Sequence, residues 1–295
     1  MSAREVDPHE REALEGESGS EPRGGAAGGW SPAPAGAGQR SLSLGLIAML
    51  PLLVAYELGA LGALRALGAL GAGATRNAAE KALFQAVELS GLSVEPVRRT
   101  ALVAVALLAA AVCFRRRVAL GPGVLRIVLE GLAGAVLLGP ALALAMEGLG
   151  AAGSVRALGA TPAGRAPELA RAAVACGGAA YEEILFRVAT YALLFVLLRR
   201  AGRFLGLSRA VARWAGELGG LLGSSILFAA FHLAAFTSWL GPGGEAFSPA
   251  AFTWRALAGI LLALLFRWRG PGVAAWSHGL FNLALFIGAG PEVLP

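Results

Sequence analysis

From Ser41 to the C-terminus, the sequence is a series of long apolar runs separated by short polar or basic segments. About 20 consecutive apolar residues are enough for a helix to cross the hydrocarbon core of a bilayer. The whole chain is 56% hydrophobic and 15% charged, whereas soluble domains carry about 25% charge. These features predict an all-α fold, a polytopic bundle of transmembrane helices.

The apolar runs define seven predicted spans. Residues 75–93 carry charges among apolar positions and are predicted to form an interfacial helix, or else an eighth helix whose polar face turns inward. The expected number of spans is therefore seven to eight. The seven predicted spans cover residues 42–64, 99–114, 124–146, 168–198, 214–239, 250–267 and 271–288.

Residues 1–40 differ in composition from the rest of the chain. Seven of the nineteen acidic residues lie here, followed by a stretch rich in Gly, Ala and Pro. A segment of this kind cannot bury enough apolar surface to offset the entropy of ordering. The sequence predicts a disordered N-terminal tail at 1–40 and a transmembrane domain at 41–295.

The 24 arginines and the single lysine give the chain a net charge of +6. They stand mainly at the ends of apolar runs, as topology anchors do, and Arg98 is interpreted as one of them. No basic face interleaved with aromatic residues is present, so nucleic acid is not an expected partner. With Arg115–Arg117, Arg199–Arg213 and Arg267–Arg269 on the cytoplasmic side, the N-terminus is cytoplasmic and the C-terminus lies outside. The Ala-, Gly- and Arg-rich composition favours a bacterial inner-membrane protein.

Two adjacent glutamates interrupt the fourth predicted span. Glu183 and Arg187 are four residues apart, share a helix face and are predicted to form an ion pair that holds the helix in place. Glu182 points about 100° away from its neighbour and is free to do chemistry. The alternative is that all three side chains form one buried ion network that joins helices.

Two further spans carry histidines. Phe228 lies one turn before His232 and can pack beneath its imidazole, while His278 lies one turn before Asn282, with Gly279 allowing a close helix contact. Either histidine by itself could serve only to join helices. Ionisable groups inside spans are expensive and usually functional, so together these motifs predict one shared polar site.

The available residues restrict the chemistry of such a site. The only aspartate, Asp7, lies in the tail, and no HExxH zinc motif is present. A water could be activated by Glu182 with His232 as general base, or by a divalent metal such as zinc held by Glu182, His232 and His278. Hydrolysis of a peptide bond is the reaction expected, with His278 and Asn282 stabilising the oxyanion.

In their order along the chain, EExxxR (Glu182 to Arg187), FxxxH (Phe228 to His232) and HxxxN (His278 to Asn282) resemble the motifs of the CPBP family. This family contains the type II CaaX prenyl endopeptidases and the bacteriocin-processing Abi proteins. The resemblance covers a protease-like core at about 168–288. It implies a helical intramembrane endopeptidase, of a family commonly labelled metalloproteases although a metal-free glutamate mechanism has also been argued. The catalytic residues it implies are Glu182, Glu183, His232, His278 and Asn282, with Arg187 as a structural partner.

The expected partners are the lipid bilayer and a peptide or membrane-protein substrate. Bacteria generally lack prenylated CaaX proteins, so bacteriocin processing, self-immunity and membrane-protein turnover all remain open. A proton-coupled transporter could use the same buried glutamates and histidines as a relay. A non-catalytic membrane scaffold could retain them for packing.

Overall fold

The computed structural model describes residues 35–67, 77–150, 168–240 and 244–288. The chain divides into two units, Met1–Ala35 and Gly36–Pro295. Most of the predicted tail, residues 1–34, lies outside the described residues, but helix α2 already begins at Ala35. The elements are α2 (Ala35–Leu67), α3 (Ala78–Leu89), α4 (Val94–Arg115), α5 (Leu120–Gly148), α6 (Glu168–Glu183), the π-helix η3 (Ile184–Tyr191), α7 (Ala192–Phe204), α8 (Arg209–Ala230), α9 (Ala234–Thr237), the 3₁₀-helix η4 (Ser238–Leu240), α10 (Pro249–Arg269) and α11 (Pro271–Gly288).

The predicted all-α membrane fold is confirmed. Over the described ranges, every regular element is a helix, and the only β-pairing is an isolated bridge between Leu233 and Glu245. In the part of the chain that the structure describes, four helices are long and apolar enough to cross a bilayer, and each coincides with a predicted span. They are Leu42–Ala60, Val94–Arg115, Leu120–Gly148 and Pro249–Arg269.

Helix α3 settles the two interpretations of residues 75–93. It has 12 residues, about 18 Å at the rise of an α-helix, which is too short for a hydrocarbon core of about 30 Å. It is therefore not an eighth span. Its polar face nevertheless turns inward, because Glu80 is buried. Asn77 caps its first turn by accepting a hydrogen bond from the backbone N–H of Ala79 (2.7 Å).

Helix continues without a break from Glu168 through the π-helix to Phe204 and contains the predicted span at 168–198. The predicted end of the next span is wrong. Helix α8 ends at Ala230, not at 239, and a turn and the short helix α9 follow. The turn is held because Glu245 donates its backbone N–H to the carbonyl of His232 (2.8 Å) and accepts from Ala234 (2.9 Å).

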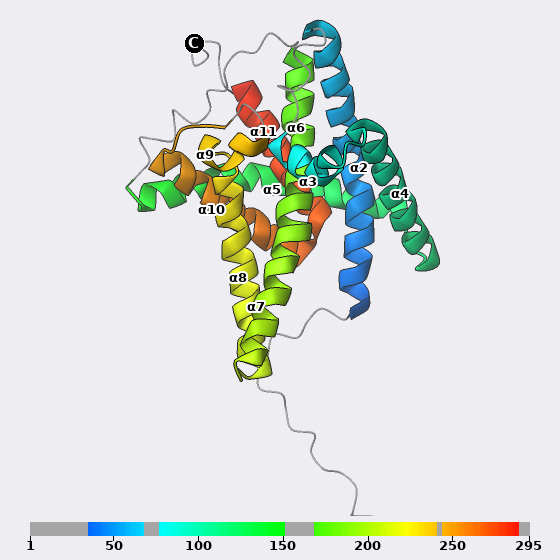
Figure 1. Ribbon diagram of the computed structural model, residues 1–295. Coiled ribbons are helices and arrows are strands. Elements are labelled where there is room, and N and C mark those ends of the chain that lie inside the picture. The colour runs from blue at the N-terminus through cyan, green and yellow to red at the C-terminus, as the bar shows by residue number, and fades with distance from the viewer. Residues whose placement is uncertain (1–34, 68–76, 151–167, 241–243, 289–295) are drawn as a thin grey trace, which may run out of the picture. The chain divides into compact units, whose positions relative to one another are not determined.

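Helix α11 is packed against α5, α6 and α10, as its red ribbon shows in Figure 1. Glycines allow these close approaches, because small residues let helix backbones come together. A Cβ added at Gly279 would lie 2.7 Å from the carbonyl oxygen of Cys176 on α6, and one at Gly131 of α5 would lie 2.3 Å from the Cβ of Trp276. The predicted role of Gly279 in helix packing is confirmed.

Arg98 was predicted to be a topology anchor, and this prediction is wrong. The side chain is fully buried and forms ion pairs with Glu80 (2.6 Å), Glu57 (2.9 Å) and Glu95 (3.1 Å). Glu80 also accepts a hydrogen bond from Tyr56 (2.5 Å). The network joins α2, α3 and α4 because a buried charge is stable only when it is paired.

Replacing Arg98 with methionine is expected to destabilise the protein by about 3 kcal/mol, because Glu80 would then be buried without its ion-pair partner. Thermal unfolding in detergent micelles measures the effect. Arg99→Met is the matched control, since Arg99 is 60% exposed and pairs only with Glu95 on its own helix. Equal melting temperatures for the two variants would contradict the structural role of Arg98.

Candidate active site

The two glutamates of the EExxxR motif are the last residues of α6, directly before the π-helix. Thr190 donates its hydroxyl to the carbonyl of Leu185, five residues earlier (2.8 Å), as the wider π-helical turn allows. Short π-helical segments occur frequently at functional sites. The side chain of Glu183 is fully buried, whereas that of Glu182 is 14% exposed. Of the two carboxylates, Glu182 is therefore the one that water can reach.

Glu183 lies between two basic side chains. Its Oε1 is 3.0 Å from Nδ1 of His278, and its Oε2 is 3.4 Å from Nε of Arg187. The Arg187 guanidinium is fully buried, donates to the carbonyl of Gly259 on α10 (3.3 Å) and lies over the ring of Phe228 (4.8 Å to the centroid). Arg187 thus connects the π-helix to α8 and α10. Glu183, the last residue of α6, connects that helix to α11.

Glu182 and Glu183 meet at the same imidazole. Nε2 of His278 is 3.4 Å from Oε2 of Glu182, and the histidine side chain is 6% exposed. The sequence predicted that the two carboxylates would face different directions. In the structure they approach opposite nitrogens of one ring.

Asn77 also contacts the exposed glutamate, and the sequence analysis did not identify it. Its Nδ2 donates to Oε1 of Glu182 (2.6 Å). The orientation of the Asn77 side-chain amide is fixed, because its Oδ1 accepts from the N–H of Ala79. The backbone of Asn77 is held as well, because its N–H donates to the Tyr56 hydroxyl (2.7 Å). The signal that could have identified Asn77 is the capping pattern Asn-x-x-Glu formed with Glu80 at the start of α3.

His232 lies just after the end of α8. Its Nδ1 is 2.9 Å from the carbonyl oxygen of Phe228, and its ring packs against the Phe228 ring with centroids 5.0 Å apart. A carbonyl oxygen can only accept, so Nδ1 carries a hydrogen, and in a neutral imidazole Nε2 is then an unprotonated base. The sequence predicted this packing of Phe228 beneath His232.

Phe228 is the centre around which the polar groups gather. Its ring is buried and contacts the rings of both His232 (5.0 Å) and His278 (5.6 Å), as well as the Arg187 guanidinium. Four of the sequence-predicted residues, Glu182, Glu183, Arg187 and His278, are in direct contact, and His232 joins them through Phe228.

Asn282 lies one helical turn after His278 on α11. Its Nδ2 donates to the carbonyl of Ala175 on α6 (3.3 Å). This hydrogen bond uses one of the two N–H groups of the amide. Asn282 therefore joins α11 to α6 and retains one donor.

The donor atoms of the predicted metal ligands, Glu182, His232 and His278, contact other groups of the protein. In the segments that the structure describes, no group of three His, Cys, Asp or Glu side chains is arranged to hold a metal ion. Both nitrogens of His278 face glutamate oxygens, and one nitrogen of His232 is taken by a backbone carbonyl. These donors do not fit a three-ligand site as they lie, and the metal stays a prediction.

The fold and the site together define a polytopic α-helical membrane protein with a buried cluster of glutamate, histidine and arginine. Residues 167–284 match the family model described as "Type II CAAX prenyl endopeptidase Rce1-like". This range contains the three sequence motifs, so the predicted resemblance to this family is confirmed. No curated protein and no solved structure matches the chain significantly.

Proposed function

We propose that this protein is an intramembrane endopeptidase in which Glu182, assisted by His232, activates the hydrolytic water. The observation that carries the proposal is the position of Glu182, the exposed member of the doublet, 3.4 Å from the imidazole of His278. A carboxylate base and a nearby hydrogen-bond donor are the two groups that peptide hydrolysis needs. The match to a protease family over the same residues supports this reaction class.

In the first step, Glu182 takes a proton from water, and the water oxygen attacks the carbonyl carbon of the substrate. Nε2 of His232, which joins the cluster through Phe228, is a second basic atom that can share the proton. The negative charge that develops on the carbonyl oxygen is stabilised by the Nε2–H of His278 and the remaining N–H of Asn282. The stored proton then passes to the amide nitrogen as the C–N bond breaks.

Glu183 and Arg187 support this chemistry without taking part in proton transfer. The contact of Glu183 with Nδ1 of His278 (3.0 Å) holds the ring so that Nε2 faces Glu182. Arg187 balances the charge of Glu183 at 3.4 Å.

The proposed substrate is a membrane protein or a membrane-anchored peptide, because the site is built inside a helix bundle that the lipid surrounds. The proposed location is the inner membrane of a bacterium, on the basis of the Ala-, Gly- and Arg-rich composition. Bacteriocin processing, self-immunity and membrane-protein turnover are the roles that such a protease can serve.

The experiment compares the peptide termini in host membranes that express either the wild-type chain or Glu182→Gln. Terminal-peptide mass spectrometry is expected to detect a set of new N-termini within or beside membrane segments only for the wild type. Identical termini for both proteins would reject the protease. A proton flux into proteoliposomes that depends on Glu182 would support the transporter instead.

Asn77 is expected to act as a positioning residue for Glu182. Serine is an equally good helix cap, so Asn77→Ser keeps the start of α3 but removes the amide that donates to Glu182. We expect about a 100-fold fall in the rate of hydrolysis, which is the usual effect of a small misplacement of a catalytic group. The melting temperature should be nearly unchanged. A variant that cleaves at the wild-type rate, in an assay where Glu182→Gln is inactive, would remove Asn77 from the mechanism.

A further inference from the structure

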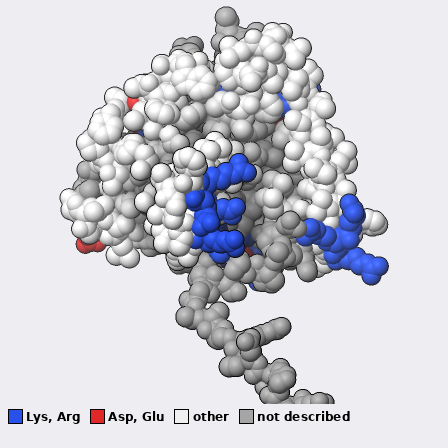
Figure 2. Space-filling model, turned by 60° about the horizontal axis from the view of Figure 1, so that its bottom comes forward, with Lys and Arg blue, Asp and Glu red and all other residues white. Residues whose placement is uncertain are grey.

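Four arginines line a cavity at the end of the α7–α8 hairpin. The cavity has a volume of about 350 Å³, and its walls are Arg199 and Arg203 of α7 with Arg209 and Arg213 of α8. Figure 2 views the molecule from the end where α7 and α8 meet in Figure 1, and basic side chains are gathered on this face. None of the four arginines belongs to the proposed catalytic cluster.

The hairpin that carries these arginines is tightly built. A Cβ added at Gly202 of α7 would lie 3.2 Å from the Cβ of Ala212, and one at Gly216 of α8 would lie 2.8 Å from the carbonyl oxygen of Phe195. Arg203 donates to the carbonyl of Leu207 in the turn (2.8 Å). The guanidinium groups therefore project from a scaffold with closely packed helices, rather than from a loose loop.

The charges of these four arginines are not balanced by ion pairs with described carboxylates. Within the described ranges, none of the four forms an ion pair with a carboxylate. Glu217, one turn after Arg213, is bound by Arg267 (2.9 and 3.0 Å) and by the Tyr191 hydroxyl (2.7 Å). The N-terminus of α8, capped by Ser208, adds a partial positive charge. A cavity with these walls fits an anion.

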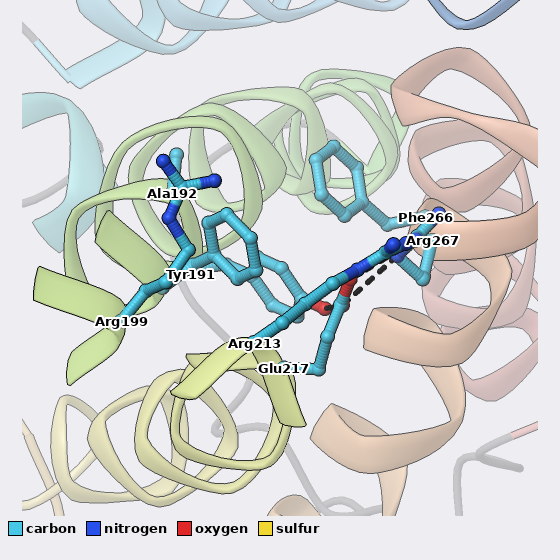
Figure 3. A pocket seen from close by; sticks show the side chains of 8 residues that line it. Tyr191, Ala192, Arg199, Arg213, Glu217, Phe266 and Arg267 are labelled. Carbon is cyan, nitrogen blue, oxygen red and sulfur yellow. Dashed lines mark hydrogen bonds and ion pairs between the residues drawn. The ribbon is translucent and has the colours of Figure 1, made fainter. Parts of the chain in front are cut away.

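A second cavity adjoins the first, and its walls combine aromatic and alanine side chains with charged ones. Its volume is about 420 Å³, and it shares Arg199 and Arg213 with the first. Figure 3 shows the rings of Tyr191 and Phe266 on its walls, with Arg213 and Arg267 beside Glu217. The remaining lining residues are Ala192 and Phe195. The two cavities together suit a ligand with an anionic head and an apolar body.

We propose that these two cavities bind an anionic phospholipid, with its phosphate among Arg199, Arg203, Arg209 and Arg213. Arginine matches phosphate with two parallel hydrogen bonds, and basic pockets between membrane helices on the cytoplasmic side suit lipid head groups. The glycerol and the start of the acyl chains lie against Phe195 and Phe266. A topology anchor needs only positive charge, whereas this site also needs a cavity.

The test measures lipid retention by the full-length protein in detergent, using native mass spectrometry with added phosphatidylglycerol or phosphatidylcholine. We expect the wild type to retain phosphatidylglycerol selectively. Each basic side chain near an anionic lipid surface contributes roughly fivefold to affinity, so Arg209→Gln with Arg213→Gln is expected to bind roughly thirtyfold more weakly. Lysine at both positions should restore much of the binding.

The matched control is Arg115→Gln with Arg200→Gln, which removes the same charge from exposed positions outside both cavities. It should bind phosphatidylglycerol within about twofold of the wild type, because screened surface charges act over a short range. Equal losses in the two double variants, or equal retention of the two lipids, would overturn the proposal. A further measurement adds inorganic phosphate as a competitor of phosphatidylglycerol. If it displaces phosphatidylglycerol completely at millimolar concentration, the ligand is free phosphate and the lipid assignment is wrong.

Discussion

Glu182→Gln is expected to abolish peptide-bond hydrolysis and to leave the fold intact. Glutamine keeps an oxygen that can accept from Asn77 but cannot take a proton from water. General-base catalysis contributes up to about 10⁴-fold, so cleavage of a membrane-anchored reporter should fall by about that factor. The measurement is the initial rate of reporter cleavage by purified protein in proteoliposomes.

The control for this variant is Glu88→Gln, which alters an exposed carboxylate on α3. It should cleave the reporter at the wild-type rate. Melting temperatures of both variants should equal that of the wild type, which separates a catalytic loss from unfolding. Full activity of Glu182→Gln would show that this carboxylate is not the base.

Arg187→Leu is expected to have the largest effect on stability. It would leave Glu183 fully buried with only His278 as a partner. Removing one partner of a buried ion pair typically costs about 3–5 kcal/mol. The melting temperature in detergent should fall accordingly, and so should the amount of protein in the membrane.

Two further variants test this explanation. The double variant Glu183→Gln with Arg187→Leu removes both charges and should recover part of the stability. Much of the cost of Arg187→Leu alone comes from the buried charge of Glu183, which has then lost its ion-pair partner. Arg126→Leu breaks an exposed pair of the same spacing, with Glu130 (2.7 Å), in which the arginine is 73% exposed, and should cost less than about 1 kcal/mol. An Arg187→Leu protein as stable as Arg126→Leu would show that the buried pair does not hold the helix.

The sequence predicted the fold class and the identity of the residues that gather in the site. Apolar run length is a direct consequence of bilayer thickness, so the membrane helices could be recognised without tertiary information. The ion pair of Glu183 with Arg187 followed from their spacing, and the packing of Phe228 on His232 did too. Each of these features depends on residues close in sequence.

The sequence could not predict how distant segments pair. In the sequence, Arg98 looks like any arginine at the start of a span. Only the packing of α2 and α3 beside α4 shows that it is buried and paired with Glu57 and Glu80. Asn77 is 105 positions from Glu182, so their contact has no local signal beyond the helix cap. Helix α8 ends before His232, where the imidazole contacts the carbonyl of Phe228 and the backbone N–H of Glu245 donates to the carbonyl of His232. Hydropathy alone does not show either contact.

The sequence also could not predict the orientation of the Glu182 and Glu183 side chains. Both glutamates lie in the α-helix α6, so the 100° separation describes their backbone positions but not where their long side chains end. His278 then approaches from α11 and contacts both carboxylates. A neighbouring helix, rather than the geometry of α6, determines what each glutamate does.

Hydrolysis of the reporter in water enriched in ¹⁸O tests the central claim most directly. Purified wild-type protein in proteoliposomes is predicted to place one ¹⁸O atom in the new C-terminal carboxyl group of the product, and Glu182→Gln is predicted to yield no labelled product. Labelled product from both proteins, or none from the wild type together with a proton flux that requires Glu182, would contradict the account.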